Sequence, residues 1–153
     1  MKQERNNYDE IHSTLIFKDG EKITFKYSTK QLYRVEKRMN LAYKIVSFLK
    51  NKQYDDIQTR LNNIVLRRTS GKTISTAFNI DELIEKLKSV DLQLGNVTEG
   101  FKPLGFRVYQ INNDKEILHI AGIIIRDKQN NNFSIDVDLN SDSEEIYLLQ
   151  YDL

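Results

Sequence analysis

The residues best suited to chemistry lie in one stretch, 133–145, which reads FSIDVDLNSDSEE. Acidic or amide side chains occupy every second position there: Asp136, Asp138, Asn140, Asp142 and Glu144. Oxygen ligands at this spacing suit a divalent-cation loop, and paired carboxylates suit acid–base catalysis. The same spacing also places side chains on one face of a β-strand, where they simply meet water.

The calcium-loop interpretation fails on the sequence. An EF-hand loop needs glycine at its sixth position and a bidentate glutamate at its twelfth. A loop that starts at Asp136 has Ser141 and Tyr147 at those positions, and a loop that starts at Asp138 also lacks both residues. The polar residues instead alternate with apolar ones, which predicts a half-buried strand with a wet face and no metal site. The apolar partners are Phe133, Ile135, Val137 and Leu139.

Acid–base catalysis would need one of the two histidines, His12 and His119. If the strand around His119 pairs with 133–139 across a turn at 127–132, the register decides which residue it meets. Matching the apolar faces places His119 opposite Leu139 and separates it from Asp138. We therefore predict no catalytic residue and interpret His119 as a hydrogen-bonded core residue. His12 is interpreted as a strand residue near the frayed terminus.

The segment RRTSGKT, residues 67–73, shares Gly-Lys-Thr with phosphate-binding loops. Such a loop also needs a glycine five residues before Gly71, where this chain has Leu66, and it should open a helix. The following TISTAF reads as a strand, so the segment is predicted to be a basic hairpin tip. We expect no cofactor, and the absence of cysteine excludes disulfides and thiolate chemistry.

Charge is distributed unevenly along the chain, although its net value is only +1. Residues 18–72 hold 14 Lys or Arg against 5 Asp or Glu, a net of +9, and residues 73–153 hold 7 against 14, a net of −7. The asymmetry favours an anionic partner for the basic part, unless the halves neutralise each other in the fold. The predicted basic surface comprises Lys30, Arg34, Lys37, Arg38, Lys44, Arg67, Arg68 and Lys72.

The acidic half offers a second binding surface, which would present carboxylates in the manner of nucleic acid. Its members are Asp136, Asp138, Asp142, Glu144 and Glu145. Phosphate binding by the basic surface would be strongly salt-dependent, because it releases counterions. Which of the two surfaces meets a partner is left open by the sequence.

Hydrophobic periodicity predicts the elements that position these residues. A hairpin around Asp19-Gly20 spans about 11–28, and a helix with an N-cap at Ser28 or Thr29 runs to about 51. Leu41, Ile45 and Phe48 lie off the main apolar stripe of that helix, so its end is either buried on two sides or part of an interface. A short helix near 54–64, a hairpin at 63–78 and a helix capped by Asn79 or Asp81 follow.

The last third predicts antiparallel strands at FRVYQI, EILHIAGIII and FSIDVDL, with EILHIAGIII in the centre. The C-terminal EEIYLLQYDL favours a strand over a helix capped at Ser141. Residues 95–105 hold three of the six glycines and the only proline, which predicts a loop. The fold class is therefore α+β: an N-terminal hairpin, a central hairpin and a C-terminal meander of three or four strands, packed with two or three helices.

We expect one domain over 1–153, with a possible subdivision at 95–105 into a basic helical part and an acidic β-rich part. No apolar run is long enough to span a membrane and the N-terminus shows no signal peptide, which favours a cytoplasmic protein. Abundant Lys, Ile and Asn indicate a low-GC genome. These features suggest a protein that is encoded by a phage or mobile element and acts in the cytoplasm of the host cell.

The favoured function is a non-enzymatic binding protein that engages nucleic acid directly, or a host protein or nucleoprotein complex that handles it. It would modulate or inhibit that complex, an anti-CRISPR-like character. The alternative is a structural or assembly protein of a virion or other homo-oligomer, joined through the Leu41–Phe48 helix end or an open strand edge. A weaker alternative is a carboxylate-dependent enzyme or divalent-cation binder.

Overall fold

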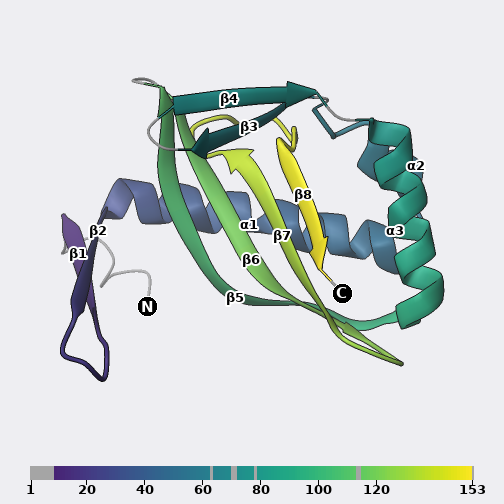
Figure 1. Cartoon of the computed structure of the whole chain (residues 1–153), viewed down its shortest axis with the longest axis horizontal. Coiled ribbons are helices and arrows are strands. Elements are labelled where there is room, and N and C mark those ends of the chain that lie inside the picture. Colours follow the sequence, from purple (N-terminus) through teal and green to yellow (C-terminus); the bar gives the residue numbers. More distant parts are fainter. Residues whose placement is uncertain (1–8, 63, 70–71, 78, 113–114, 153) are drawn as a thin grey trace. The chain divides into compact units, whose positions relative to one another are not determined.

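A computed structural model describes the backbone of residues 9–62, 64–69, 72–77, 79–112 and 115–152, and the side chains of these residues outside 63–78, 112–114 and 151–153. The fold is α+β, as predicted (Figure 1). In chain order its elements are β1 (Glu10–Ile16), β2 (Lys22–Ser28), α1 (Thr29–Lys50), α2 (Tyr54–Gln58), β3 (Ile64–Thr69), β4 (Lys72–Ala77), α3 (Ile80–Leu94), β5 (Val97–Asn112), β6 (Lys115–Arg126), β7 (Asn131–Asp138) and β8 (Leu148–Asp152).

The chain divides into two compact units, residues 1–37 and 38–153. Helix α1 contributes its first turns to one unit and the remainder to the other. Within the described residues, the first unit holds the β1–β2 sheet, and the second holds the β3–β4 sheet and the four-stranded sheet β5-β6-β7-β8. The stretch 95–105 lies inside the second unit.

The first unit confirms the predicted hairpin and helix start. Gly20 has the positive φ of 89° that a tight turn demands, and the Asp19 side chain accepts a hydrogen bond from the Glu21 amide. At the start of α1, the Ser28 hydroxyl accepts from the Gln31 amide at 3.1 Å. The Gln31 side chain accepts in return from the Ser28 amide at 3.2 Å. This reciprocal capping box explains why the helix begins here.

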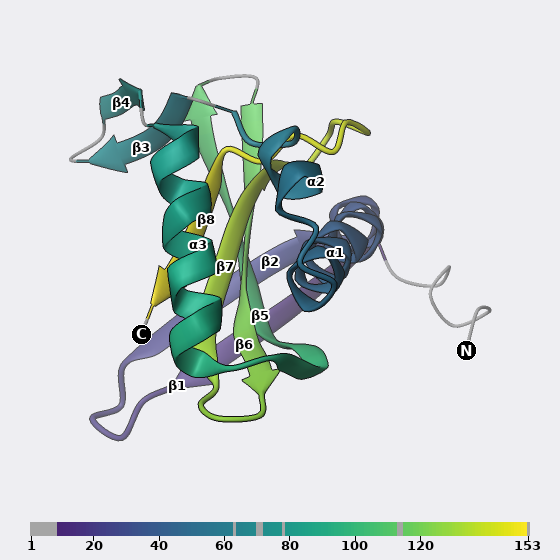
Figure 2. The same ribbon diagram turned by 90° about the vertical axis from the view of Figure 1, so that its right-hand side faces the viewer.

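The second half of α1 is buried on two sides, one of the two outcomes expected for this helix end. Ala42, Val46 and Leu49 of the main stripe are buried, and so are Leu41 and Ile45. This half of α1 lies along one face of the β5–β8 sheet (Figure 2). Because Leu41 and Ile45 fill the core of their own chain, they leave little apolar surface for a subunit contact.

The β5–β8 meander supplies another large part of the core, to which α2 and α3 also contribute buried side chains. Along β6, the even-numbered residues from Leu118 to Ile124 are buried, whereas odd-numbered residues from His119 to Ile125 are half-buried. The ring of Phe101 packs edge-on between those of Tyr43 and Phe133, with centroids 5.5 Å away in each case. A Cβ at position 122 would lie 2.3 Å from that ring, so only Gly122 permits this approach.

The prediction of a loop at 95–105 is wrong. Most of this stretch belongs to β5, which pairs with β6. The register of this pairing shifts between Val97 and Gly100 and again between Pro103 and Gly105. β5 is an edge strand, where a proline breaks no inward ladder bond and glycines allow bulges. The glycines and proline therefore bend the strand instead of ending it.

The C-terminus forms the predicted strand, β8, which pairs with β7. Ser141 caps no helix; its hydroxyl accepts from the amide of Ser143 in a local turn. The predicted helix cap at Asn79 is present, since its side chain accepts hydrogen bonds from the amides of Asp81 and Glu82 at the start of α3. Over the described residues, none of the helices has the length and apolar character needed to cross a membrane.

A buried ion pair joins α3 to β6. Arg126 Nη2 and Asp91 Oδ1 are 2.7 Å apart, and both side chains are almost completely buried. Arg126 also donates to Asn131 Oδ1 and to the carbonyl of Gly95, each at 2.7 Å. The hydroxyl of Tyr54 donates to Asp91 Oδ2 at 2.5 Å. Since each charge has several partners, the desolvation cost of burying it is offset.

Candidate functional sites

The histidine that we expected to lie away from the aspartates in fact binds one of them. Residues of β6 and β7 pair with His119 opposite Asp136, and not opposite Leu139. His119 Nδ1 lies 2.6 Å from Asp136 Oδ1, and the His119 side chain is 25% exposed. The predicted register and the predicted separation of the two residues are both wrong.

Tyr109 completes this cluster from β5. Its hydroxyl donates a short hydrogen bond to the second carboxylate oxygen, Asp136 Oδ2. Burial raises the pKa of Tyr109 above its usual value, and the hydrogen bond to Asp136 raises it further. The phenol therefore stays protonated and remains a donor, so both oxygens of Asp136 are occupied.

Asp136 also departs from the predicted wet face, since it is only 4% exposed. The two flanking polar residues of the stretch differ from it: Ser134 is buried and Asp138 half-buried. The β3–β4 hairpin lies on the side of the sheet opposite α1, near the end of β5 (Figures 1 and 2). Alternation in the sequence correctly placed these residues on one face but did not reveal that Asp136 is buried there.

Within this cluster, the contact with Asp136 orients the imidazole of His119. An ionised carboxylate only accepts hydrogen bonds, so His119 Nδ1 carries the proton and Nε2 is the outward nitrogen. Arg107 of β5 pairs directly across from His119. Its guanidinium carbon lies 5.7 Å from the centre of the Tyr109 ring, on the same side of the sheet.

The remaining acidic residues of the predicted surface contact basic and polar partners. Glu144 forms ion pairs with Lys44 and with Arg60, the latter at 2.8 Å. The Lys44 ammonium, and after it the Arg60 guanidinium, hold the pKa of Glu144 below its usual value. Asp138 lies 3.7 Å from Lys115. Asp142 is exposed, and it too has a polar or electrostatic interaction.

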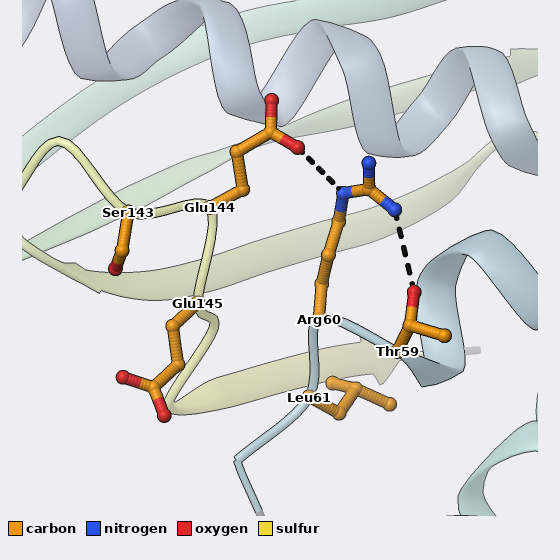
Figure 3. Close-up of a pocket in the computed structure, with 6 residues that line it drawn as sticks. All are labelled: Thr59, Arg60, Leu61, Ser143, Glu144 and Glu145. Atoms are coloured by element: carbon orange, nitrogen blue, oxygen red, sulfur yellow. Dashed lines mark hydrogen bonds and ion pairs between the residues drawn. The ribbon is translucent and has the colours of Figure 1, made fainter.

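A surface hollow of about 330 Å³ lies beside these ion pairs (Figure 3). Thr59, Arg60 and Leu61 line one side, and the loop 143–145 lines the other. Arg60 reaches across to Glu144, and Glu145 accepts at 2.7 Å from the side chain of Asn62. These polar groups already form hydrogen bonds with one another, so we interpret the hollow as a contact between two loops and not as a ligand site.

The predicted basic surface is also divided. Arg38 is only 5% exposed and donates to the carbonyl of Ser143 at 2.7 Å. Burial lowers the pKa of its guanidinium, and the nearby Asp138 opposes that change. The assumption that Arg38 is exposed is therefore wrong. Lys44 is exposed, but its ammonium binds Glu144.

For the six other basic residues, binding to an anionic partner stays a prediction. Lys30 and Lys37 are exposed and Arg34 is half-buried. The side chains of Arg67, Arg68 and Lys72 lie outside the described residues, although the backbone confirms the predicted β3–β4 hairpin that carries them. The ion pairs of Lys44 and Arg60 with Glu144 show that part of the +9 and −7 asymmetry is neutralised within the second unit.

Sequence reasoning missed the apolar face of the β1–β2 hairpin. Cross-strand pairing places Leu15 opposite Ile23, Ser13 opposite Phe25 and Ile11 opposite Tyr27, all on one face without a charge. Ile11, Leu15 and Ile23 are 46%, 51% and 44% exposed. The signal was present in the alternation of IHSTLIF and KITFKYS, but alternation does not say whether the apolar face is covered.

Among the described residues, no group of three or more His, Asp or Glu side chains is placed to hold a metal ion. No family model, curated protein or solved structure matches this chain. The features that remain as a basis for function are the Tyr109–Asp136–His119 cluster and the apolar face of the hairpin.

Proposed function

We propose that this chain is a non-enzymatic binding protein whose N-terminal hairpin docks onto a partner protein. The observation that carries the proposal is the uncharged apolar face of β1–β2, with Ile11, Leu15 and Ile23 about half exposed. A two-stranded hairpin alone is marginal in water, and contiguous exposed apolar residues typically mark an interaction site. Docking would cover this face and stabilise the hairpin.

The net charge of the segment that carries this face favours an acidic partner over a second copy. Residues 18–37 hold six Lys or Arg against three Asp or Glu, a net of +3. Lys22 and Lys26 lie on the opposite face of β2, and Lys30 and Lys37 follow on α1, all exposed. Two copies would bring units of like charge together, whereas an acidic partner that presents an apolar patch would be complementary. A protein of a nucleic-acid-handling complex suits the proposal if it presents such a patch.

The proposal is tested with two matched double variants. Leu15→Ser with Ile23→Ser removes the apolar face, and Thr14→Ser with Thr24→Ser changes the directly adjacent cross-strand pair on the opposite face. The dye ANS serves as a probe that needs no partner. We expect the wild type and the threonine variant to enhance ANS fluorescence equally, and the Leu15/Ile23 variant to lose most of the enhancement. Equal enhancement by all three would overturn the proposal.

The partner is then sought by affinity capture from host lysate with the same three proteins. A protein captured by the wild type and the threonine variant, lost with the Leu15/Ile23 variant and reconstituted with purified components supports docking. Capture that is equal with all three contradicts it. Light scattering covers the remaining case, because concentration-dependent dimerisation that the Leu15/Ile23 variant abolishes would assign the face to a second copy. A mobility shift with nucleic acid that survives in this variant would separate direct nucleic-acid binding from the hairpin.

A further inference from the structure

The second inference concerns the half-buried face of the β5–β8 sheet. We propose that His119 and Arg107 form a binding site for a phosphate group. This site lies within residues 38–153 and does not depend on the hairpin. It would give a binding protein a small-ligand or backbone-phosphate contact that its hairpin cannot supply.

The imidazole of His119 is held in one orientation. Asp136 is buried and accepts from His119 Nδ1 on one oxygen and from Tyr109 on the other. This holds the ring and leaves Nε2 directed away from the carboxylate, on a side chain that is 25% exposed. Among the described residues, no protein atom bonds Nε2.

Arg107 lies beside this imidazole on the neighbouring strand. Cross-strand partners on one face of an antiparallel pair have Cβ atoms about 4.5–5.5 Å apart, so Arg107 and His119 are immediate neighbours. The side chain of Arg107 is exposed and packs over the Tyr109 ring. Among the described residues, no carboxylate forms an ion pair with it, in contrast to Lys44, Arg60 and Arg126.

The side chains of Arg107 and His119 can both bind phosphate oxygens. A guanidinium presents a planar set of donors that matches phosphate oxygens. An imidazolium Nε2–H donates to a phosphate dianion, and a neutral imidazole Nε2 accepts from a phosphate monoanion. The same nitrogen therefore faces the ligand in both protonation states. Asp136 is occupied by its two donors, so it positions His119 and does not itself meet the ligand.

The experiment follows the ring nitrogens of His119 by NMR in the full-length chain during titration with inorganic phosphate. We expect millimolar phosphate to shift Nε2 and the Arg107 side-chain resonance together. Arg107→Gln removes a charge-assisted contact and should weaken binding roughly tenfold. Lys102→Gln removes an exposed charge from the same strand and should change affinity by less than about twofold, because a screened surface charge contributes little.

Further arms identify the source of the phosphate. A mononucleotide that binds like inorganic phosphate would indicate a small ligand, and a single-stranded oligonucleotide that binds more tightly would indicate a nucleic-acid backbone. No shift of His119 with inorganic phosphate overturns the proposal. An equal loss in Lys102→Gln and Arg107→Gln also overturns it, because it would show diffuse charge attraction. The Leu15/Ile23 variant should bind phosphate like the wild type, so this test and that of the hairpin fail independently.

Discussion

The β1–β2 hairpin and the β5–β8 sheet use apolar and polar residues in opposite ways. In the hairpin, the apolar residues Leu15 and Ile23 face outward on the sheet face that lacks charge. In the four-stranded sheet, the charged residues Asp136 and Arg126 are buried. Both buried charges have several internal partners, whereas Ile11, Leu15 and Ile23 remain about half exposed. An exposed apolar face indicates a contact still to be made, and a saturated polar cluster indicates one already made.

The largest effect should come from the buried ion pair of the second unit. Asp91→Ala leaves the Arg126 guanidinium buried without its counter-charge, which should lower the free energy of unfolding by about 3–5 kcal/mol. Urea denaturation followed by circular dichroism measures this loss. The control is Glu85→Ala, which removes an exposed ion pair with Lys88 and should leave the midpoint unchanged. Similar midpoints for both variants would contradict the role assigned to Asp91.

A smaller effect is expected at the Tyr109–Asp136 contact. Tyr109→Phe removes one donor from the buried carboxylate and should cost about 1–3 kcal/mol of unfolding free energy. Tyr33→Phe is the control, since Tyr33 is exposed.

Alkaline spectrophotometric titration checks the same contact independently. Burial raises the pKa of both Tyr109 and Tyr54, so these two phenols should stay protonated where exposed tyrosines have ionised. Tyr109→Phe should remove one phenol from this late phase and leave the earlier phase unchanged. Loss of a phenol from the earlier phase instead would show that Tyr109 is an ordinary tyrosine.

The smallest effect should come from the hairpin. Leu15→Ala should change the free energy of unfolding by no more than about 0.5 kcal/mol, because half of the side chain already meets water. Leu149→Ala, the same change at a buried position of β8, should cost about 2–5 kcal/mol. A loss at Leu15 comparable to that at Leu149 would show that the hairpin face is already covered in the monomer.

Much of the fold could be predicted because it depends on local signals. Asp19-Gly20 supplies the turn geometry, Ser28 and Gln31 the capping box and Asn79 the next helix cap. The loop predicted at 95–105 failed because glycine and proline mark bulges as well as loops, and the choice depends on whether a neighbouring strand is present. That neighbour, β6, is ten or more residues farther along the chain.

The prediction that His119 lies away from the aspartates failed for a related reason. Matching of apolar faces cannot select the β6–β7 register, because β6 is apolar at both parities. Asp136 binds His119 with one oxygen and Tyr109, from a third strand, with the other, and no local pattern indicates this arrangement. Arg38 was misplaced similarly, since helical spacing cannot show that the 141–145 loop folds over it.

By itself, the sequence determined the element types outside 95–105, the turn and cap residues, the α+β class and the uneven distribution of charge, because each depends on neighbours within a few residues. Only the tertiary structure decided which polar residues are buried together, which ion pairs neutralise the two halves and which apolar face remains exposed. These outcomes depend on strand register and on contacts between residues tens of positions apart, such as Lys44 with Glu144 and Asp91 with Arg126. Local periodicity carries no information about such distant partners.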